Sequence, residues 1–276
     1  MGGLGGWRQC VLLAGVLFAS HFAQAEEITI SGSGNPEYVL QKLAEQFTKT
    51  HSAHRIAIPA SSGTAGAIRD VLSGAVVLGR VGRPLKPDEL AKGLVFVPIG
   101  RDPVAFVAGA GTTAKGLTSA QVLDVYSGKT TNWSALGAKP APIRAIGRET
   151  SDASRQAIFR INKPFEAIQF GENVKVVHLD PQMIELLDRY PSSLGFLNRS
   201  ALSACKTKVV FLSVDGVEPS PQNVGVGRYP YLLEFGLIHK PGALTPGTRA
   251  FIDFIRSSEG IRILRENGVL AAASPA

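Results

Sequence analysis

Residues 28–35 read Ile-Thr-Ile-Ser-Gly-Ser-Gly-Asn, a short apolar strand pattern that runs directly into a turn of small, hydroxyl-rich residues. The same kind of turn occurs at Ser61-Ser62-Gly63-Thr64 and at Ser151-Asp152-Ala153-Ser154, and Arg148 lies just ahead of the latter. Each turn precedes a stretch with helical spacing of apolar residues. A single Ser-Gly segment is usually a plain loop or a helix cap, so the repetition in matching positions is what favours a functional interpretation.

These turns predict a pocket for a small anion. The first turn of a helix leaves backbone N–H groups without partners and carries partial positive charge. Serine and glycine let a ligand approach those groups closely, and the hydroxyls add further donors. Arg148 supplies a full positive charge. Three helix starts and one arginine together therefore favour an oxyanion site.

Strand-like and helix-like patterns alternate along the chain, which predicts an α/β fold with parallel-rich sheets flanked by helices. The spacing predicts a helix over 39–47, two separate strands over 94–98 and 104–107, and a loop over 215–229. In open sheets of this class, ligands bind beyond the carboxyl ends of the strands. The first two serine turns fall at that place.

The first 25 residues have the pattern of a targeting segment. Arg8 precedes an apolar run over residues 10–22, and Ala23-Gln24-Ala25 is a small-x-small cleavage site. The run is too short to span a bilayer comfortably, so a cleaved signal peptide over residues 1–25 is favoured over a membrane anchor. We therefore expect residues 26–276 to be exported, soluble and periplasmic.

Composition argues against several other classes of protein. The formal net charge is +7, but the basic residues are scattered and few aromatic residues lie among them, so no nucleic-acid partner is expected. Cys205 is the single cysteine after the leader, which excludes an internal disulfide. The histidines after the leader are isolated along the sequence and predict neither a metal cluster nor a nucleophile–base pair. We expect no enzyme, no metal and no cofactor.

Some charged residues are set aside at this stage. Asp180, Glu185 and Asp188 fit the solvated face of a helix and do not form a convincing acid–base pair. Arg80 and Arg83 follow an apolar segment, where cleft residues can occur. For Arg80 we favour a solvated face or a helix-end contact.

The chain resembles the phosphate-binding branch of the periplasmic substrate-binding proteins of ABC transporters. The motifs that carry the resemblance extend over nearly all of the chain after the leader, at residues 31–34, 61–66, 79–86, 117–133, 148–155, 193–196, 229–230 and 257–260. The family implies a type II fold, with two lobes, two chain crossings and a ligand cleft between the lobes. Lobe 1 is expected at 26–105 plus 232–276, and lobe 2 at 106–231.

The resemblance also implies a function. The resemblance implies an exported, monomeric, non-enzymatic binding protein that captures a small oxyanion and delivers it to an ABC permease in the inner membrane. Phosphate is the first candidate for this oxyanion. Three alternatives stay open: a different anion, a receptor or accessory protein without a role in transport, and an exported phosphate-ester hydrolase. The hydrolase would need a metal cluster or an activated nucleophile.

The ligand residues implied by the resemblance come from the three turns and the arginine. They are Ser33, Gly34, Asn35, Ser61, Arg148, Asp152, Ala153 and Ser154. The chain departs from the family at Val77, which falls at or beside the acidic residue that accepts a proton from phosphate. It departs again at Asp152 and Ala153, where the family has a serine and a glycine.

Asp152 has three interpretations. It can cap its own helix, because aspartate is a good N-cap residue. Its carboxylate can take over the proton-accepting role that Val77 lacks. The third interpretation is a ligand other than phosphate, because a carboxylate and a phosphate oxygen repel each other in a desolvated cleft.

Overall fold

The computed structural model describes residues 26–273. The expected signal peptide at 1–25 lies outside the described residues. Between residues 26 and 273, no helix is both long enough and apolar enough to cross a membrane.

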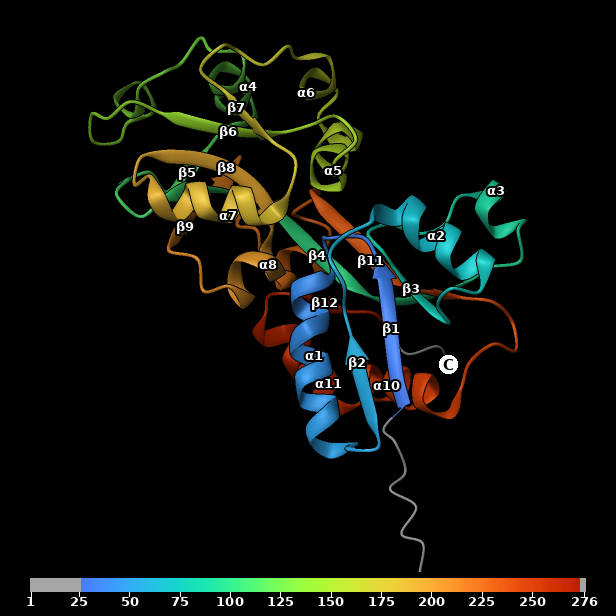
Figure 1. Cartoon of the computed structure of the whole chain (residues 1–276). Coiled ribbons are helices and arrows are strands. Elements are labelled where there is room, and N and C mark those ends of the chain that lie inside the picture. The colour runs from blue at the N-terminus through green and yellow to red at the C-terminus, as the bar shows by residue number, and fades with distance from the viewer. Residues whose placement is uncertain (1–25, 274–276) are drawn as a thin grey trace, which may run out of the picture.

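Twelve strands form within the described residues (Figure 1). They are β1 (Glu26–Gly32), β2 (His54–Ala57), β3 (Leu78–Val81), β4 (Val95–Gly109), β5 (Gly116–Leu117), β6 (Arg144–Arg148), β7 (Lys175–Val177), β8 (Ser193–Asn198), β9 (Val209–Phe211), β10 (Ser213–Val214), β11 (Leu232–His239) and β12 (Leu270–Ala271).

Helices connect most of these strands. They are α1 (Glu37–Thr50), α2 (Gly63–Ser73), α3 (Pro87–Leu90), α4 (Ser119–Tyr126), the 3-10 helix η1 (Trp133–Leu136), α5 (Ala153–Ile161), α6 (Lys163–Ala167), α7 (Asp180–Arg189), α8 (Arg199–Ala204), α9 (Pro221–Gly225), α10 (Pro246–Arg256) and α11 (Ser258–Glu266). The expected loop at 215–229 therefore contains a short helix, α9. Ser220 caps this helix by accepting a hydrogen bond from Asn223 N, and Pro221 stands at its first position.

The main sheet has the order β2-β1-β3-β11-β4-β8-β6-β7, and β12 and β9 also pair with β4. β1 is parallel to β2 and β3, and β6 is parallel to β7 and β8. Between these parallel groups, β11 and β4 run antiparallel to their neighbours. In Figure 1, β4 and β11 run between the part of the molecule that contains β1 and the part that contains β6. The predicted mixed α/β fold is confirmed.

The chain passes between the two parts through β4. The prediction of two separate strands here is wrong, because β4 continues from Val95 to Gly109. Prolines 98 and 103 interrupt the sequence pattern, but the pairing with β11 continues past both of them. Gly236 pairs with Pro98 and Phe235 with Gly100, so Ile99 of β4 is the extra residue of a β-bulge at this point. From Val104 onward, β4 changes partners and pairs with β8 and β9.

Each part of the molecule has its own apolar core. Around β1, helix α1 buries Leu43 and Phe47 on one face, as its helical spacing predicts, and packs against α10 and α11. Around β6, Phe106 and Phe196 form the centre of a second core, which also contains Tyr126. The two cores hold the strand ends in place, and the loops at those ends form the candidate site.

Candidate functional site

The site begins at the carboxyl ends of β1 and β3, which lie side by side. Their parallel pairing sets Gly32 opposite Arg80, so the loop after β1 (residues 33–36, called loop 1) starts beside the end of β3. Gly32 has a φ of +132°, and a Cβ there would lie 2.1 Å from the carbonyl oxygen of Arg80. Only glycine fits at this junction. Its own carbonyl accepts a hydrogen bond from Ser62 N at 3.0 Å, which ties the loop after β2 (residues 58–62, called loop 2) to loop 1.

Loop 1 contacts the start of α5 directly. Asn35 Nδ2 donates to Ser154 Oγ at 3.3 Å, although these residues are 119 positions apart in the chain. Ser33 Oγ donates in turn to Asn35 Oδ1 at 3.3 Å, and all three residues are buried. A Cβ at Gly82, just after β3, would lie 2.8 Å from Ser33 Oγ and 3.7 Å from the Cβ of Ala153. Residues from the first and third predicted turns therefore meet, with Gly82 packed against both.

Ser61 of loop 2 lies beside Gly34 and is exposed. A Cβ added to Gly34 would lie 3.3 Å from Ser61 Oγ and 3.6 Å from Asp180 Oδ2. Ser61 Oγ itself accepts a hydrogen bond from Gly63 N at 3.3 Å. The second predicted turn thus borders loop 1, and the carboxylate of Asp180 reaches the same place from the other part of the molecule.

Arg148 ends β6 and is 4% exposed, so its charge is buried. Its Nη2 pairs with Asp152 Oδ2 at 2.7 Å and donates to the His178 carbonyl at 3.2 Å. Its Nη1 pairs with Asp180 Oδ1. The predicted anion-binding guanidinium therefore already has two carboxylate partners.

Asp180 is 7% exposed, so its placement on a solvated face was wrong. It begins α7, shortly after β7, and β7 pairs in parallel with β6. The sequence contained a signal for this position, because Asp180 lies where a strand pattern ends and a helix pattern begins. The serine turns were selected by the same rule. Glu185 and Asp188, further along α7, are exposed as expected.

Asp152 caps α5, as the first of its three interpretations predicts. Its Oδ1 accepts a hydrogen bond from Arg155 N at 2.9 Å, while its Oδ2 pairs with Arg148. Burial raises the pKa of Asp152 to about 6, against the lowering effect of the Arg148 charge, and Asp180 raises it further. One guanidinium thus balances two carboxylates at this point.

Arg80 is fully buried, which contradicts its expected place on a solvated face or helix end. Its Nε donates to Ser33 O at 2.8 Å, and its Nη2 donates to Pro59 O at 2.7 Å. The same Nη2 pairs with Glu37 at 3.0 Å, and Nη1 donates to the Ile30 carbonyl. The arginine therefore fixes loops 1 and 2 from behind and does not face a ligand. Its position inside a short apolar strand was the available signal.

Val77 lies away from the site. It precedes β3 and packs, half-buried, against the core that contains Phe47. The loops gather at the opposite end of β3, so the assignment of Val77 to the family's acidic position is wrong on geometry. The residue of this segment that contacts the site is Gly82, which has no side chain to accept a proton.

A buried polar network supports loop 1 from behind. Asn198 Nδ2 lies 2.9 Å from both Asn35 O and Asp102 Oδ2. Ser200 donates to the same carboxylate through its N at 3.1 Å and its Oγ at 2.5 Å. Burial raises the pKa of Asp102 to about 6, and the donated hydrogen bonds only partly offset that effect. Sequence reasoning missed this network, because its members lie far apart in the chain.

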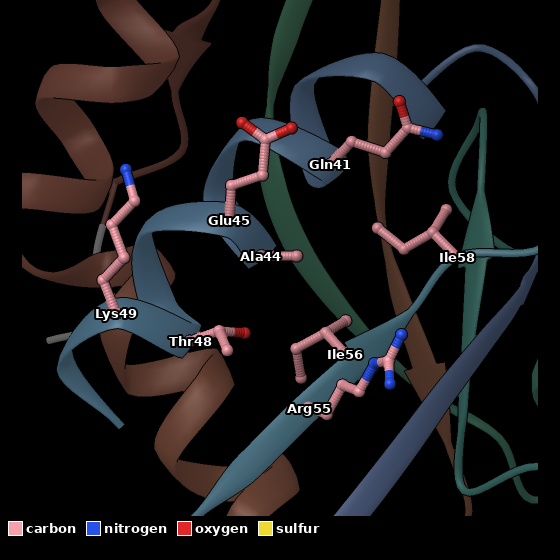
Figure 2. A pocket seen from close by; sticks show the side chains of 8 residues that line it. All are labelled: Gln41, Ala44, Glu45, Thr48, Lys49, Arg55, Ile56 and Ile58. Carbon is pink, nitrogen blue, oxygen red and sulfur yellow. The ribbon is translucent and has the colours of Figure 1, made fainter. Parts of the chain in front are cut away.

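A surface hollow of about 520 Å3 lies elsewhere, between α1 and β2 (Figure 2). Gln41, Glu45 and Lys49 of α1 line one side of it, and Arg55 and Ile56 of β2 line the other. It contains none of the eight predicted ligand residues. Among the residues that the structure describes, no group of three or more His, Cys, Asp or Glu side chains could hold a metal ion.

The family model of the PBP superfamily domain matches residues 19–259 of the chain. The phosphate-binding protein PstS of Borreliella burgdorferi is 22% identical over 249 residues, which cover 88% of this chain and 89% of that protein. PstS of Bacillus subtilis is 26% identical over 236 residues, which cover 84% of this chain and 76% of that protein. A Clostridium perfringens structure assigned as a phosphate ABC transporter substrate-binding protein, with bound phosphate, is 29% identical at a TM-score of 0.76. That match covers 90% of this chain and all of that one.

Proposed function

The chain belongs to the PBP superfamily, and we propose that this protein is a solute-binding protein for an ABC transporter. It captures a small oxyanion, and phosphate is the first candidate. The relatives named above are phosphate-binding proteins, and the Clostridium perfringens structure holds phosphate. These names support phosphate as the ligand of this chain.

The contact between Asn35 and Ser154 carries the proposal. It joins loop 1 to the start of α5 by a hydrogen bond of 3.3 Å between buried side chains. Hydroxyl and amide groups from separate segments meet there, beside backbone N–H groups at helix starts. Such groups donate hydrogen bonds to an oxyanion without adding negative charge. The proposed ligand residues remain the eight named from the sequence, with Gly82 added as a neighbour.

The change of partners along β4 supports a division into two lobes. We place the boundary where β4 leaves β11 and pairs with β8, near Val104. The second crossing is proposed just before β11. Movement of the two parts about these crossings would open and close the site by a hinge motion. The proposed lobes are 26–105 plus 232–276, and 106–231.

The proposed setting follows from the leader and the relatives. Residues 1–25 would direct export and be removed, which leaves a periplasmic, monomeric protein. Its partner would be an ABC permease in the inner membrane. The named relatives are binding proteins, which supports a role in binding and not in catalysis.

Calorimetric titration of residues 26–276 tests the proposal. Phosphate should bind with at least micromolar affinity, which corresponds to about 8 kcal/mol. Ser154→Ala removes one donor and should weaken phosphate binding by about tenfold. Ser73→Ala, at the exposed end of α2, is the matched control and should leave affinity unchanged.

Two results would contradict the proposal. The first is no phosphate binding by the wild-type chain at millimolar phosphate. The second is release of phosphate from a phosphate ester by the purified chain, with or without added divalent metal, since that activity would identify a hydrolase.

A further inference from the structure

Asp180 has a buried carboxylate oxygen without a partner. Within residues 26–273, its Oδ1 pairs with Arg148 but its Oδ2 makes no hydrogen bond. The residue is 7% exposed, and Oδ2 lies 3.6 Å from the position that a Cβ on Gly34 would occupy. A carboxylate oxygen buried in this way costs stability unless a donor reaches it. The unpaired oxygen lies beside loop 1, at the candidate site.

Asp152 differs from Asp180 in this respect, although it pairs with the same arginine. Its Oδ1 accepts the capping hydrogen bond from Arg155 N, and its Oδ2 pairs with Arg148. Both of its oxygens therefore have partners. Of the two carboxylates on Arg148, only that of Asp180 has an oxygen without any hydrogen-bond partner among the described residues.

The charges around Arg148 also favour a ligand that donates a hydrogen bond to Asp180. Arg148 faces two carboxylates, so the cluster carries an excess of negative charge when both are ionised. The nearby Arg80 is paired with Glu37, and Arg155 donates to the Arg148 carbonyl at 2.6 Å and stacks over Phe170. None of these cations is left to balance a fully ionised anion. A ligand that brings its own hydrogen donor fits this site better than one with acceptors alone.

We propose that Asp180 is a specificity-determining residue that accepts a hydrogen from the bound ligand, so that the site takes oxyanions that carry a donor group. This inference rests on the proposed function, because it concerns the same site. The donor is either the hydroxyl of a protonated phosphate or an ammonium group attached to a phosphonate. Sulfate has neither at neutral pH and would leave Asp180 unpaired against a second negative charge.

The experiment is calorimetry of residues 26–276 at pH 7.5 with phosphate, sulfate and 2-aminoethylphosphonate. The wild-type chain should prefer phosphate over sulfate by at least about 100-fold, because a site built to pair a donor rejects a ligand that lacks it. Asp180→Asn keeps the shape but presents an amide donor, so it should reduce that preference by about tenfold or more. Glu185→Gln, on the exposed face of the same helix, is the matched control and should leave the preference unchanged.

A phosphate-to-sulfate preference that stays the same in Asp180→Asn would overturn this inference while leaving phosphate binding intact. Absence of phosphate binding in the wild-type chain would instead contradict the proposed function. Titration with 2-aminoethylphosphonate identifies the donor group of the ligand. If this compound binds the wild-type chain more tightly than phosphate does, and Asp180→Asn loses that advantage, the donor is the ammonium group. If Asp180→Asn does not fold by circular dichroism, Asp180→Ser removes the charge with a smaller side chain and carries the same expectation.

Discussion

Replacing Arg80 should cost more stability than replacing any exposed arginine of the chain. Its fully buried guanidinium donates to three backbone carbonyls and pairs with Glu37. Arg80→Met keeps most of the volume but leaves the carbonyls of Ser33 and Pro59 without this donor and Glu37 without its cation. Breaking a buried ion pair from one side costs about 3–5 kcal/mol. This is a large fraction of the 5–15 kcal/mol that stabilises a typical protein.

The assay is urea unfolding of residues 26–276, followed by the fluorescence of Trp133, which is buried, and by circular dichroism. Arg69→Met is the matched control, because Arg69 is 71% exposed and pairs with its neighbour Asp70 on α2. Exposed pairs contribute at most about 1 kcal/mol, so this variant should unfold close to the wild-type midpoint. Phosphate affinity should fall in Arg80→Met, since both loops lose their support. A loss of less than about 1 kcal/mol in Arg80→Met would refute the assignment of Arg80 as the residue that fixes the two loops.

Two further predictions concern residues around the site. Gly82→Ala places a methyl group 2.8 Å from Ser33 Oγ, so loop 1 must shift and phosphate affinity should fall by about tenfold or more. Gly225→Ala, where the new Cβ makes ordinary contact, is the control. Equal phosphate affinities in the two variants would contradict the prediction. Asp102 has a pKa of about 6 when folded, above its ordinary value of 3.8, so its stabilising contribution is full below about pH 4 and is lost as the pH rises through 6. The free energy of unfolding of the wild type minus that of Asp102→Asn should therefore fall by about 2–3 kcal/mol from pH 4 to 7. A difference that does not vary with pH would show that the Asp102 carboxyl is not desolvated.

The sequence was most informative where local pattern decides structure. Apolar residues at helical spacing predicted the buried face of α1, and the strand patterns predicted most of the sheet. The continuous β4 was missed because its two prolines resemble breaks, while β11, the strand that pairs with β4 past both prolines, is a distant segment of the chain. Pairing between distant segments cannot be read from the spacing of one of them.

The site shows the same limit. The hydroxyl-rich turns could be found from the sequence, because a turn with small residues is a local signal, and they follow the ends of β1, β2 and β6. The roles of Arg80 and Asp180 depend on partners far along the chain, so their charges were read as solvated when they are buried in ion pairs. Val77 precedes β3, whereas Gly82 follows it and lies at the end where the loops meet, and the spacing of residues along the family pattern does not distinguish these two ends of the strand.

A crystal structure of residues 26–276 grown with phosphate would show directly where the anion binds. We predict phosphate density bounded by Ser33, Asn35, Gly82 and Ser154, within hydrogen-bond distance of at least two of the serine or asparagine side chains. Phosphate found only at other places, such as the hollow between α1 and β2, with the contact between Asn35 and Ser154 unchanged, would contradict the proposed site.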